Sequence, residues 1–464
     1  MKTRSAMRLF AMLLTPLSLG VLISHAQTVV SWNGGNGNWS TATDWSGGVV
    51  PNNGVGHTYH PIIDNNGDVA LDLSIVVSDL TVGTSGRLDG SGNNSLTIAP
   101  AGIFTNRGAL TFGTDLSGSN VLSIQQGGRL INFGNVAASG MASGVDVTGT
   151  TTNNAGATID LENVSGSTFA GNVNSWGTFK TGTGANVTVT GTFANKAGAQ
   201  FIVRGNYPTG DVAQVNALNN FGYFLADGGI LKVTGNVTNG GTFISGLSSI
   251  GGNGQVSVGG SFTNTASGTV TLQHGVSFIT VGGAMTNSGV VQITRNNSPG
   301  TGLTAARYTQ RAGMTAVTGM LAAGVVTVTG GTIQAYNAPL GGDLTLGGSG
   351  VAPTVEVGRF VTLGSFTESS TGTLKVDIEG STPGLNQGQL QVQGAARLSG
   401  KLTATLTPRN PAWTPAIGQT FTILIAKSVS GTFSNSTIPI NSSEHFVVSY
   451  TPTSVVLNVV SGAA

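Results

Sequence analysis

The sequence contains no cysteine, and this absence excludes disulfide bonds, thiolate catalysis and cysteine-ligated metals. Charged residues are also scarce: they make up 8% of the chain, against about 25% in typical soluble domains. Once residues 1–26 are set aside, 16 basic residues face 18 acidic ones, a net charge of −2. Because this charge is small, we expect neither nucleic acid nor an anionic membrane surface as a partner. Helical periodicity of useful length is missing after the N-terminus, which indicates an all-β chain.

Long apolar runs are missing as well, with one exception at the N-terminus. Three basic residues precede the mostly apolar segment 9–23, and Ser24-His25-Ala26 places small residues where a signal peptidase reads them. This run of 15 residues is shorter than the about 20 that a membrane-spanning helix needs. We therefore predict a signal peptide over 1–26, no membrane-spanning segment after its cleavage, and a secreted or cell-surface bacterial protein.

The chain is built instead from a repeat. A short run of alternating apolar and polar residues ends on Asn, a Gly follows one to four residues later, and a second alternating run begins. The anchor positions are Asn106, Asn132, Asn154, Asn174, Asn195, Asn220, Asn239, Asn264 and Asn287, and Gln310 takes the same place in the next copy. The mean step is about 23 residues, which suits one coil of a parallel β-solenoid.

This repeat predicts a parallel β-helix or β-solenoid of about 12 coils over residues 91–369. The alternation gives each strand one buried face, and Gly and Asn between the runs tolerate the positive φ that tight corners require. Stacked Asn side chains would form a hydrogen-bonded ladder from coil to coil. A β-sandwich is the alternative, but the persistence of one motif over nine steps argues against it.

Both ends depart from the repeat. Residues 27–90 are rich in Trp and Gly and predict a β cap, because a solenoid must cover its open core at each end. Trp32, Trp39 and Trp45 are the candidates to cover it; the alternative is that these rings bind a ligand by stacking on sugars. Residues 370–464 predict a C-terminal β module, either a small sandwich or a continuation that closes the solenoid.

Candidate metal ligands lie within the cap. Asp64, Asn66 and Asp68 resemble the alternating oxygen ligands of a calcium loop, although the Glu that ends such a loop does not follow. Asn66 and Gly67 between two alternating runs also predict a type I′ β-hairpin, which explains these residues more simply. Two histidines within 57–60 suit the start of a zinc site, yet a third ligand is not evident. The sequence therefore indicates no cofactor.

Candidate catalytic residues are few. Between residues 90 and 360 only eight acidic residues occur, and Asp160 and Glu162 are the one close pair. Their spacing puts both carboxylates on one face of a strand, where they could act as an acid/base pair. The alternative is an ordinary solvated strand face.

Three arginines are candidates for ligand binding. Arg295, Arg307 and Arg311 lie in a segment without acidic residues, and 296–306 interrupts the repeat and predicts a loop. Their guanidinium groups could bind an anionic glycan; the alternative is that they only keep the loop soluble.

The opening segment 31–40, the Asn–Gly repeat and the ending over 418–457 carry a resemblance to a known group. They resemble secreted bacterial proteins with autotransporter-associated β-strand repeats, over nearly all of the chain after residue 26. The resemblance implies a β-helical exported passenger, often used at the cell surface. No C-terminal membrane barrel follows in this sequence, so self-translocation across an outer membrane is not expected.

Two functions follow from these observations. The regular repeat and the shortage of acidic residues favour a non-catalytic extracellular structural or adhesive protein, whose partners would be glycans or surface proteins. The alternative is a polysaccharide-binding or polysaccharide-cleaving β-helix protein, acting as a lyase or hydrolase, and it rests on the fold class alone.

Overall fold

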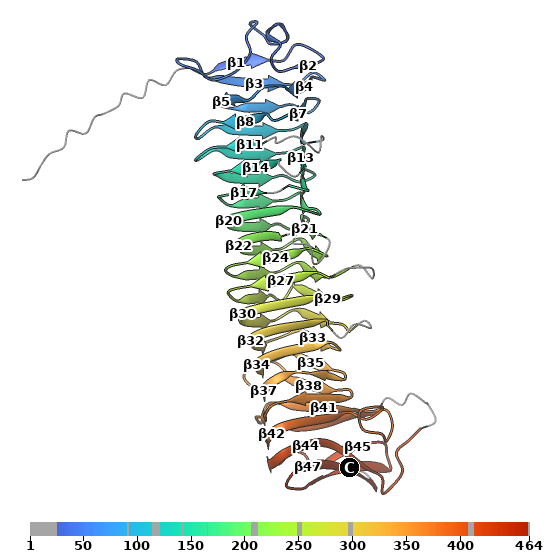
Figure 1. Cartoon of the computed structure of the whole chain (residues 1–464). Helices are drawn as coiled ribbons and strands as arrows, with labels where there is room; N and C mark the ends of the chain where they lie inside the picture. Colours follow the sequence, from blue (N-terminus) through green and yellow to red (C-terminus); the bar gives the residue numbers. More distant parts are fainter. Residues whose placement is uncertain are drawn as a thin grey trace, which may run out of the picture.

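The computed structural model is an all-β parallel solenoid of about 13 turns, drawn as a rod with strand β1 at one end and β47 at the other (Figure 1). At the usual strand spacing of about 4.8 Å such a rod is about 60 Å long. The predicted solenoid is confirmed. The structure describes residues 26–90, 92–113, 121–140, 143–164, 166–205, 212–247, 253–295, 300–406 and 413–462. The predicted signal peptide, apart from Ala26, lies outside these residues.

Each coil contributes to three ladders of parallel strands. In one coil, β8 (Ser95–Ile98) belongs to the first ladder, β9 (Ile103–Asn106) to the second and β10 (Ala109–Phe112) to the third. Each strand pairs in parallel with the equivalent strands of neighbouring coils, as β8 does with β5 and β11. Residues at one position of the repeat therefore form a column along the rod.

The other strands follow the same scheme. The first ladder also contains β5 (Ile75–Val77), β11 (Val121–Ile124), β14 (Gly144–Val147), β17 (Ser167–Phe169), β24 (Ile230–Val233), β27 (Gln255–Val258), β36 (Ala338–Pro339) and β39 (Phe360–Leu363). The second also contains β1 (Thr28–Ser31), β3 (Tyr59–Ile63), β6 (Leu80–Val82), β12 (Arg129–Asn132), β15 (Thr150–Asn153), β18 (Val173–Ser175), β25 (Val237–Asn239), β28 (Phe262–Asn264), β37 (Gly341–Leu346) and β40 (Phe366–Glu368). Strands that run through both are β20 (Asn186–Asn195), β22 (Val212–Asn220), β30 (Phe278–Asn287), β32 (Gly302–Gln310), β34 (Met320–Val328), β42 (Gln389–Leu398) and β44 (Thr420–Gly431). The third also contains β2 (Asn36–Asn38), β4 (Asp68–Leu71), β7 (Arg87–Gly90), β13 (Asn135–Ser139), β16 (Thr158–Glu162), β19 (Thr178–Thr181), β21 (Gln200–Arg204), β23 (Tyr223–Asp227), β26 (Thr242–Ser245), β29 (Thr269–Leu272), β31 (Val290–Ile293), β33 (Met314–Val317), β35 (Thr332–Ala335), β38 (Thr354–Val357), β41 (Thr373–Ile378) and β43 (Lys401–Leu406).

A single apolar core fills the interior of the rod. Alternate residues of each strand point inward, as Leu96 and Ile98 do in β8. Midway along the rod the core contains a run of phenylalanines whose neighbouring ring centroids lie 4.1 to 5.9 Å apart. Burying this continuous apolar column supplies the main stabilisation of a chain that has no disulfides.

The predicted asparagine ladder is present at the corner between the second and third ladders. Its buried members are Asn106, Asn132, Asn153, Ser175, Asn195, Asn220, Asn239, Asn264, Asn287 and Gln310. The side-chain hydrogen bonds between successive members measure 2.7 to 3.2 Å, each donated to the next coil. Ser175 is the exception, since it donates to the carbonyl of Gly177. The predicted anchors Asn154 and Asn174 are wrong by one residue, because a shift of one position moves a side chain to the opposite face of a strand.

Glycine follows the ladder because the corner leaves no room for a side chain. A Cβ on Gly222 would lie 2.3 Å from the carbonyl oxygen of Ala199, and one on Gly241 would lie 2.1 Å from that of Gly222. These carbonyls accept hydrogen bonds from the next coil, so the repeated Asn–Gly pair sets the turn into the third ladder.

The N-terminal end is covered by an indole cluster. Trp32, Trp39 and Trp45 are at most 1% exposed, and the ring centroid of Trp45 lies 5.0 Å from that of Trp32 and 4.8 Å from that of Trp39. A 3-10 helix (Ala42–Asp44) lies between the second and third of them. Parallel pairing already begins within the predicted cap, where β2 pairs with β4.

The predicted hairpin at Asn66 and Gly67 is wrong. Asn65 and Asn66 do adopt positive φ, but the flanking strands β3 and β4 do not pair with each other. Strand β3 pairs with β1 and β6, whereas β4 pairs with β2 and β7. The turn is therefore a solenoid corner, since two positive φ angles redirect the chain equally well toward another coil.

The C-terminal end closes the rod with antiparallel strands. Parallel pairing continues through β42 and β44, beyond the predicted boundary at 370. Strand β44 then pairs antiparallel with β47 (Ser454–Ser461), and β46 (Glu444–Tyr450) pairs antiparallel with both β47 and β45 (Thr437–Pro439). Across the described part of the chain, no helix has the length and apolar character to cross a membrane.

Candidate functional site: an exposed aromatic stripe

Three large aromatic side chains lie exposed at the same corner of different coils. Phe133, Trp176 and Phe221 are 41%, 43% and 48% exposed. Each directly follows a buried ladder residue, so the alternation that places the ladder side chain inside places the next one outside. Their amides donate to carbonyls of the preceding coil at 2.7 to 2.8 Å, so the three belong to one column.

The coils between these aromatics contribute polar or cationic side chains to the same column. We call this column the aromatic stripe; its members in axial order are Arg107, Phe133, Asn154, Trp176, Lys196 and Phe221. The Arg107 guanidinium carbon lies 4.4 Å from the centre of the Phe133 ring, and Lys196 Nζ lies 5.4 Å from the centre of the Trp176 ring. These cation–π contacts hold both rings in place.

The spacing of the aromatics is regular. They occupy alternate coils, so neighbouring rings are separated by about 9.6 Å along the rod, twice the strand spacing. A stripe of rings with this period suits an extended β-linked polysaccharide, in which every second sugar presents the same face to one side.

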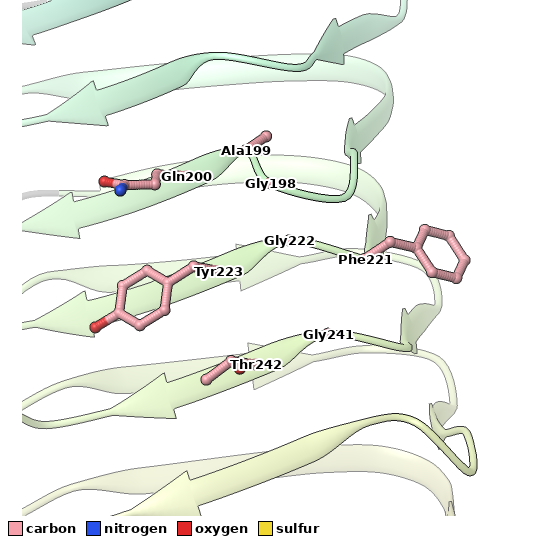
Figure 2. A pocket seen from close by; sticks show the side chains of 8 residues that line it. All are labelled: Gly198, Ala199, Gln200, Phe221, Gly222, Tyr223, Gly241 and Thr242. Atoms are coloured by element: carbon pink, nitrogen blue, oxygen red, sulfur yellow. The ribbon is translucent and has the colours of Figure 1, made fainter. Parts of the chain in front are cut away.

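An open depression of about 390 Å³ lies beside Phe221. Figure 2 shows Phe221 on one side of the corner, Gln200 and Tyr223 on the other, and the glycines that follow the ladder between them. Burial, with a further contribution from the negative charge of Asp227, raises the pKa of Tyr223. The phenol therefore remains a neutral hydroxyl at physiological pH, able to donate to or accept from a sugar.

The predicted carboxylate pair, Asp160 and Glu162, does lie on one face of β16. Lys180, on β19 of the next coil, bridges both carboxylates at 2.7 and 2.8 Å. Burial lowers the pKa of Lys180, but its hydrogen bonds to the two carboxylates outweigh this and raise it. One structural cation thus bridges the pair and occupies an oxygen of each carboxylate, so the two are not arranged as separate acid and base.

The three tryptophans of the N-terminal end are not a sugar platform. Their rings are buried, and each indole N–H donates to a backbone carbonyl, that of Gly35, Pro51 or Trp39. The expectation that they are buried cap residues is confirmed, and their burial contradicts the alternative that the rings stack on sugars.

The predicted calcium ligands are engaged within the fold. Asp64 accepts a 2.8 Å hydrogen bond from Ser85, which lowers the pKa of its carboxyl, and the amide of Asn66 donates to the same hydroxyl. Asp68 lies 3.8 Å from Arg87. Among the described residues, no group of three or more acidic or histidine side chains is placed to hold a metal ion. The structure therefore offers no support for a calcium site here.

The two neighbouring histidines also have separate surroundings. His57 is exposed, and its ring stacks on that of Tyr59 with the two ring centroids 6.5 Å apart. The Nε2 atom of His60 instead lies 2.8 Å from the hydroxyl oxygen of Thr81.

The three candidate arginines do not share one loop. Residues 296–299 lie outside the described part of the chain, but 302–310 form strand β32, so the predicted loop over 296–306 is wrong there. Arg307 lies within β32, opposite Ala284 and Val325. Arg295 follows β31 of the third ladder, and Arg311 follows β32 at the Asn-ladder corner.

No known protein family matches this chain, and no curated protein is similar to it in sequence. The class that the fold defines is a β-helical repeat protein.

Proposed function

We propose that this chain is a non-catalytic extracellular or cell-surface β-solenoid that adheres to extended polysaccharides through the aromatic stripe. The observation that carries the proposal is the alignment of three half-exposed aromatic rings on alternate coils. Exposed apolar surface gathered in one column is typical of interaction sites.

The physical basis of adhesion is stacking. The C–H faces of sugars are apolar, and packing them on aromatic rings removes both surfaces from water. Burying the exposed half of one ring would contribute on the order of 1–2 kcal/mol. Three rings on a rigid rod act together, because the solenoid has already fixed their spacing before the ligand binds.

The extracellular location is supported by two features of the sequence. The N-terminal segment 1–26 has the pattern of a signal peptide. The resemblance to autotransporter-associated β-strand repeat proteins points the same way, and the β-helical fold agrees with it.

The cleaving alternative has less support. Its best candidates, Asp160 and Glu162, share one bridging lysine, which occupies an oxygen of each carboxylate. We therefore assign the carboxylate pair to coil-to-coil stabilisation.

The test is retention of the purified chain on immobilised β-linked polysaccharides, measured by affinity electrophoresis. Trp176→Ala and Phe221→Ala are each expected to weaken binding about 5- to 30-fold, the equivalent of about 1–2 kcal/mol. Val325→Ala is the matched control, because Val325 is 38% exposed but lies away from the stripe. Equal binding by the stripe variants and the control would refute the proposal.

The same polysaccharides should show no release of reducing ends. Release that disappears in Asp160→Asn or Glu162→Gln would contradict the non-catalytic assignment and restore the cleaving alternative.

A further inference from the structure

A second candidate site lies at a different corner, between the third and first ladders. Two adjacent cavities of about 290 and 220 Å³ share Arg295 and Asn337 in their linings. The larger is also lined by Tyr336, Arg359 and Glu379. Together they fall within the range of small-molecule sites, about 300–1,000 Å³.

The lining residues form an axial cleft. The residues that line the larger cavity follow successive strands of the third ladder, β31, β33, β35, β38 and β41. The cleft therefore spans four coil steps, about 19 Å at the strand spacing. Its two guanidinium groups, Arg295 and Arg359, lie three coils apart.

Tyr336 is held in place by a buried polar cluster. Its hydroxyl donates a 2.6 Å hydrogen bond to Asp377, which is 4% exposed and lies two coils further on. The ring crosses Gly358, where a Cβ would lie 2.0 Å from a ring carbon, so this position needs glycine. Next to Asp377, the buried Glu356 is paired with Lys375 at 3.2 Å. The wall of the cleft is thus rigid.

We propose that this cleft is a binding site for carboxylated sugars, with Arg295 and Arg359 binding the carboxylates. This inference does not depend on the aromatic stripe, which lies at the other corner of the coil.

The choice of ligand follows from the chemistry of the lining. Guanidinium groups bind planar carboxylates through two parallel hydrogen bonds. The Tyr336 ring in the larger cavity, and Met320 and Pro339 in the smaller, offer apolar surface to the C–H faces of a sugar. Glu379 places one negative charge among the cations, which limits how many acidic groups the cleft accepts.

The experiment is calorimetric titration of the purified chain with trigalacturonate, and with neutral galactotriose as the uncharged comparison. Trigalacturonate should bind and galactotriose should bind at least about tenfold more weakly. Arg295→Gln and Arg359→Gln should each reduce affinity about tenfold or more. Arg307→Gln, which removes an exposed guanidinium outside the cleft, should leave affinity unchanged. Glu379→Gln should increase affinity, because it removes a charge of the same sign as the ligand.

The outcomes separate this site from its rivals. Equal losses in the Arg307 and Arg359 variants would mean non-specific charge attraction and would overturn the proposal. Equal binding of a sulfated galactan would overturn the assignment to carboxylates. Trp176→Ala should not change trigalacturonate binding; a loss there would place the acidic sugar on the aromatic stripe instead. Thermal unfolding of each variant confirms that a lost affinity is not a lost fold.

Discussion

The direction of the asparagine ladder predicts that equivalent substitutions along it have unequal costs. Asn220 donates to Asn239 Oδ1 at 2.7 Å and to the Thr242 carbonyl at 2.9 Å, and accepts from Asn195 at 2.7 Å. Asn195 donates to Asn220 and to the Tyr223 carbonyl, but its own Oδ1 has no hydrogen-bond partner among the described residues. The preceding member, Ser175, donates instead to the Gly177 carbonyl.

Asn220→Ala should therefore destabilise the chain more than Asn195→Ala. Both substitutions remove two donated bonds from fully buried sites, so their cavity costs largely cancel. Asn220→Ala additionally leaves one N–H of Asn195 buried without an acceptor, which costs about 1–3 kcal/mol. Asn195→Ala leaves no such donor and also removes an oxygen that already lacks a partner. We expect a difference of about 2 kcal/mol between the two variants.

Urea denaturation followed by circular dichroism measures this difference. The double variant should cost less than the sum of the single ones, because the two residues share a hydrogen bond. Equal losses, or a larger loss for Asn195→Ala, would refute a ladder in which Asn195 donates to Asn220 and Asn220 to Asn239.

Three further outcomes follow from the structure. Burial raises the pKa of Glu368 from 4.5 to about 8, so the stability of the chain falls as the pH rises between these two values. Glu368→Gln should remove this pH-dependent loss of stability, which is at most about 5 kcal/mol. A variant whose Tm depends on pH as the unaltered chain's does would contradict this. Lys180→Met should lower stability by about 1 kcal/mol in urea denaturation, because it leaves two adjacent carboxylates without their cation. The loss should shrink at high salt, which screens their repulsion; a loss that persists there would exclude charge as its cause. Gly222→Ala should cost about 1–3 kcal/mol by the same assay, since its Cβ meets two backbone carbonyls, whereas Gly54→Ala, which meets nothing within 4 Å, should be close to neutral.

Much of the fold could be predicted because each coil repeats the same physical solution. Apolar alternation, a buried amide and a glycine at the corner recur about every 23 residues, and these features together define a parallel solenoid. The errors arose where one residue decides the face of a strand. At β18 the ladder residue is Ser175, which accepts a hydrogen bond from Asn153 as an Asn would. The neighbouring Asn174 shifted the predicted register by one residue.

Because of this one-residue error in register, the aromatic stripe was not predicted from the sequence. With the ladder at Asn132 and Asn220, the following residues Phe133 and Phe221 were already placed outside by alternation. Trp176 joins them only when the ladder residue is Ser175. The stripe could therefore be predicted from the sequence as the set of residues that directly follow the ladder residues, provided that the register of every coil is correct.

The charged cleft is a different case. Arg295, Tyr336, Arg359 and Glu379 are separated by about 20 to 40 residues, and none lies in a recognisable motif. What unites them is that each follows a strand of the third ladder. Because strand ends and loop lengths vary from coil to coil, sequence spacing alone does not align these positions.

In a solenoid, a surface site is therefore formed by residues that share one position of successive coils, and these residues do not form a continuous sequence motif. The stacking of coils fixes the axial distance between neighbouring column members at about 4.8 Å, whatever the residues are. A change of one side chain consequently alters the surface without altering the spacing of the rest. In this chain two corners carry different chemistry, rings on one and guanidinium groups on the other, and the two proposed sites occupy different stretches of the rod, so each can be altered without touching the other.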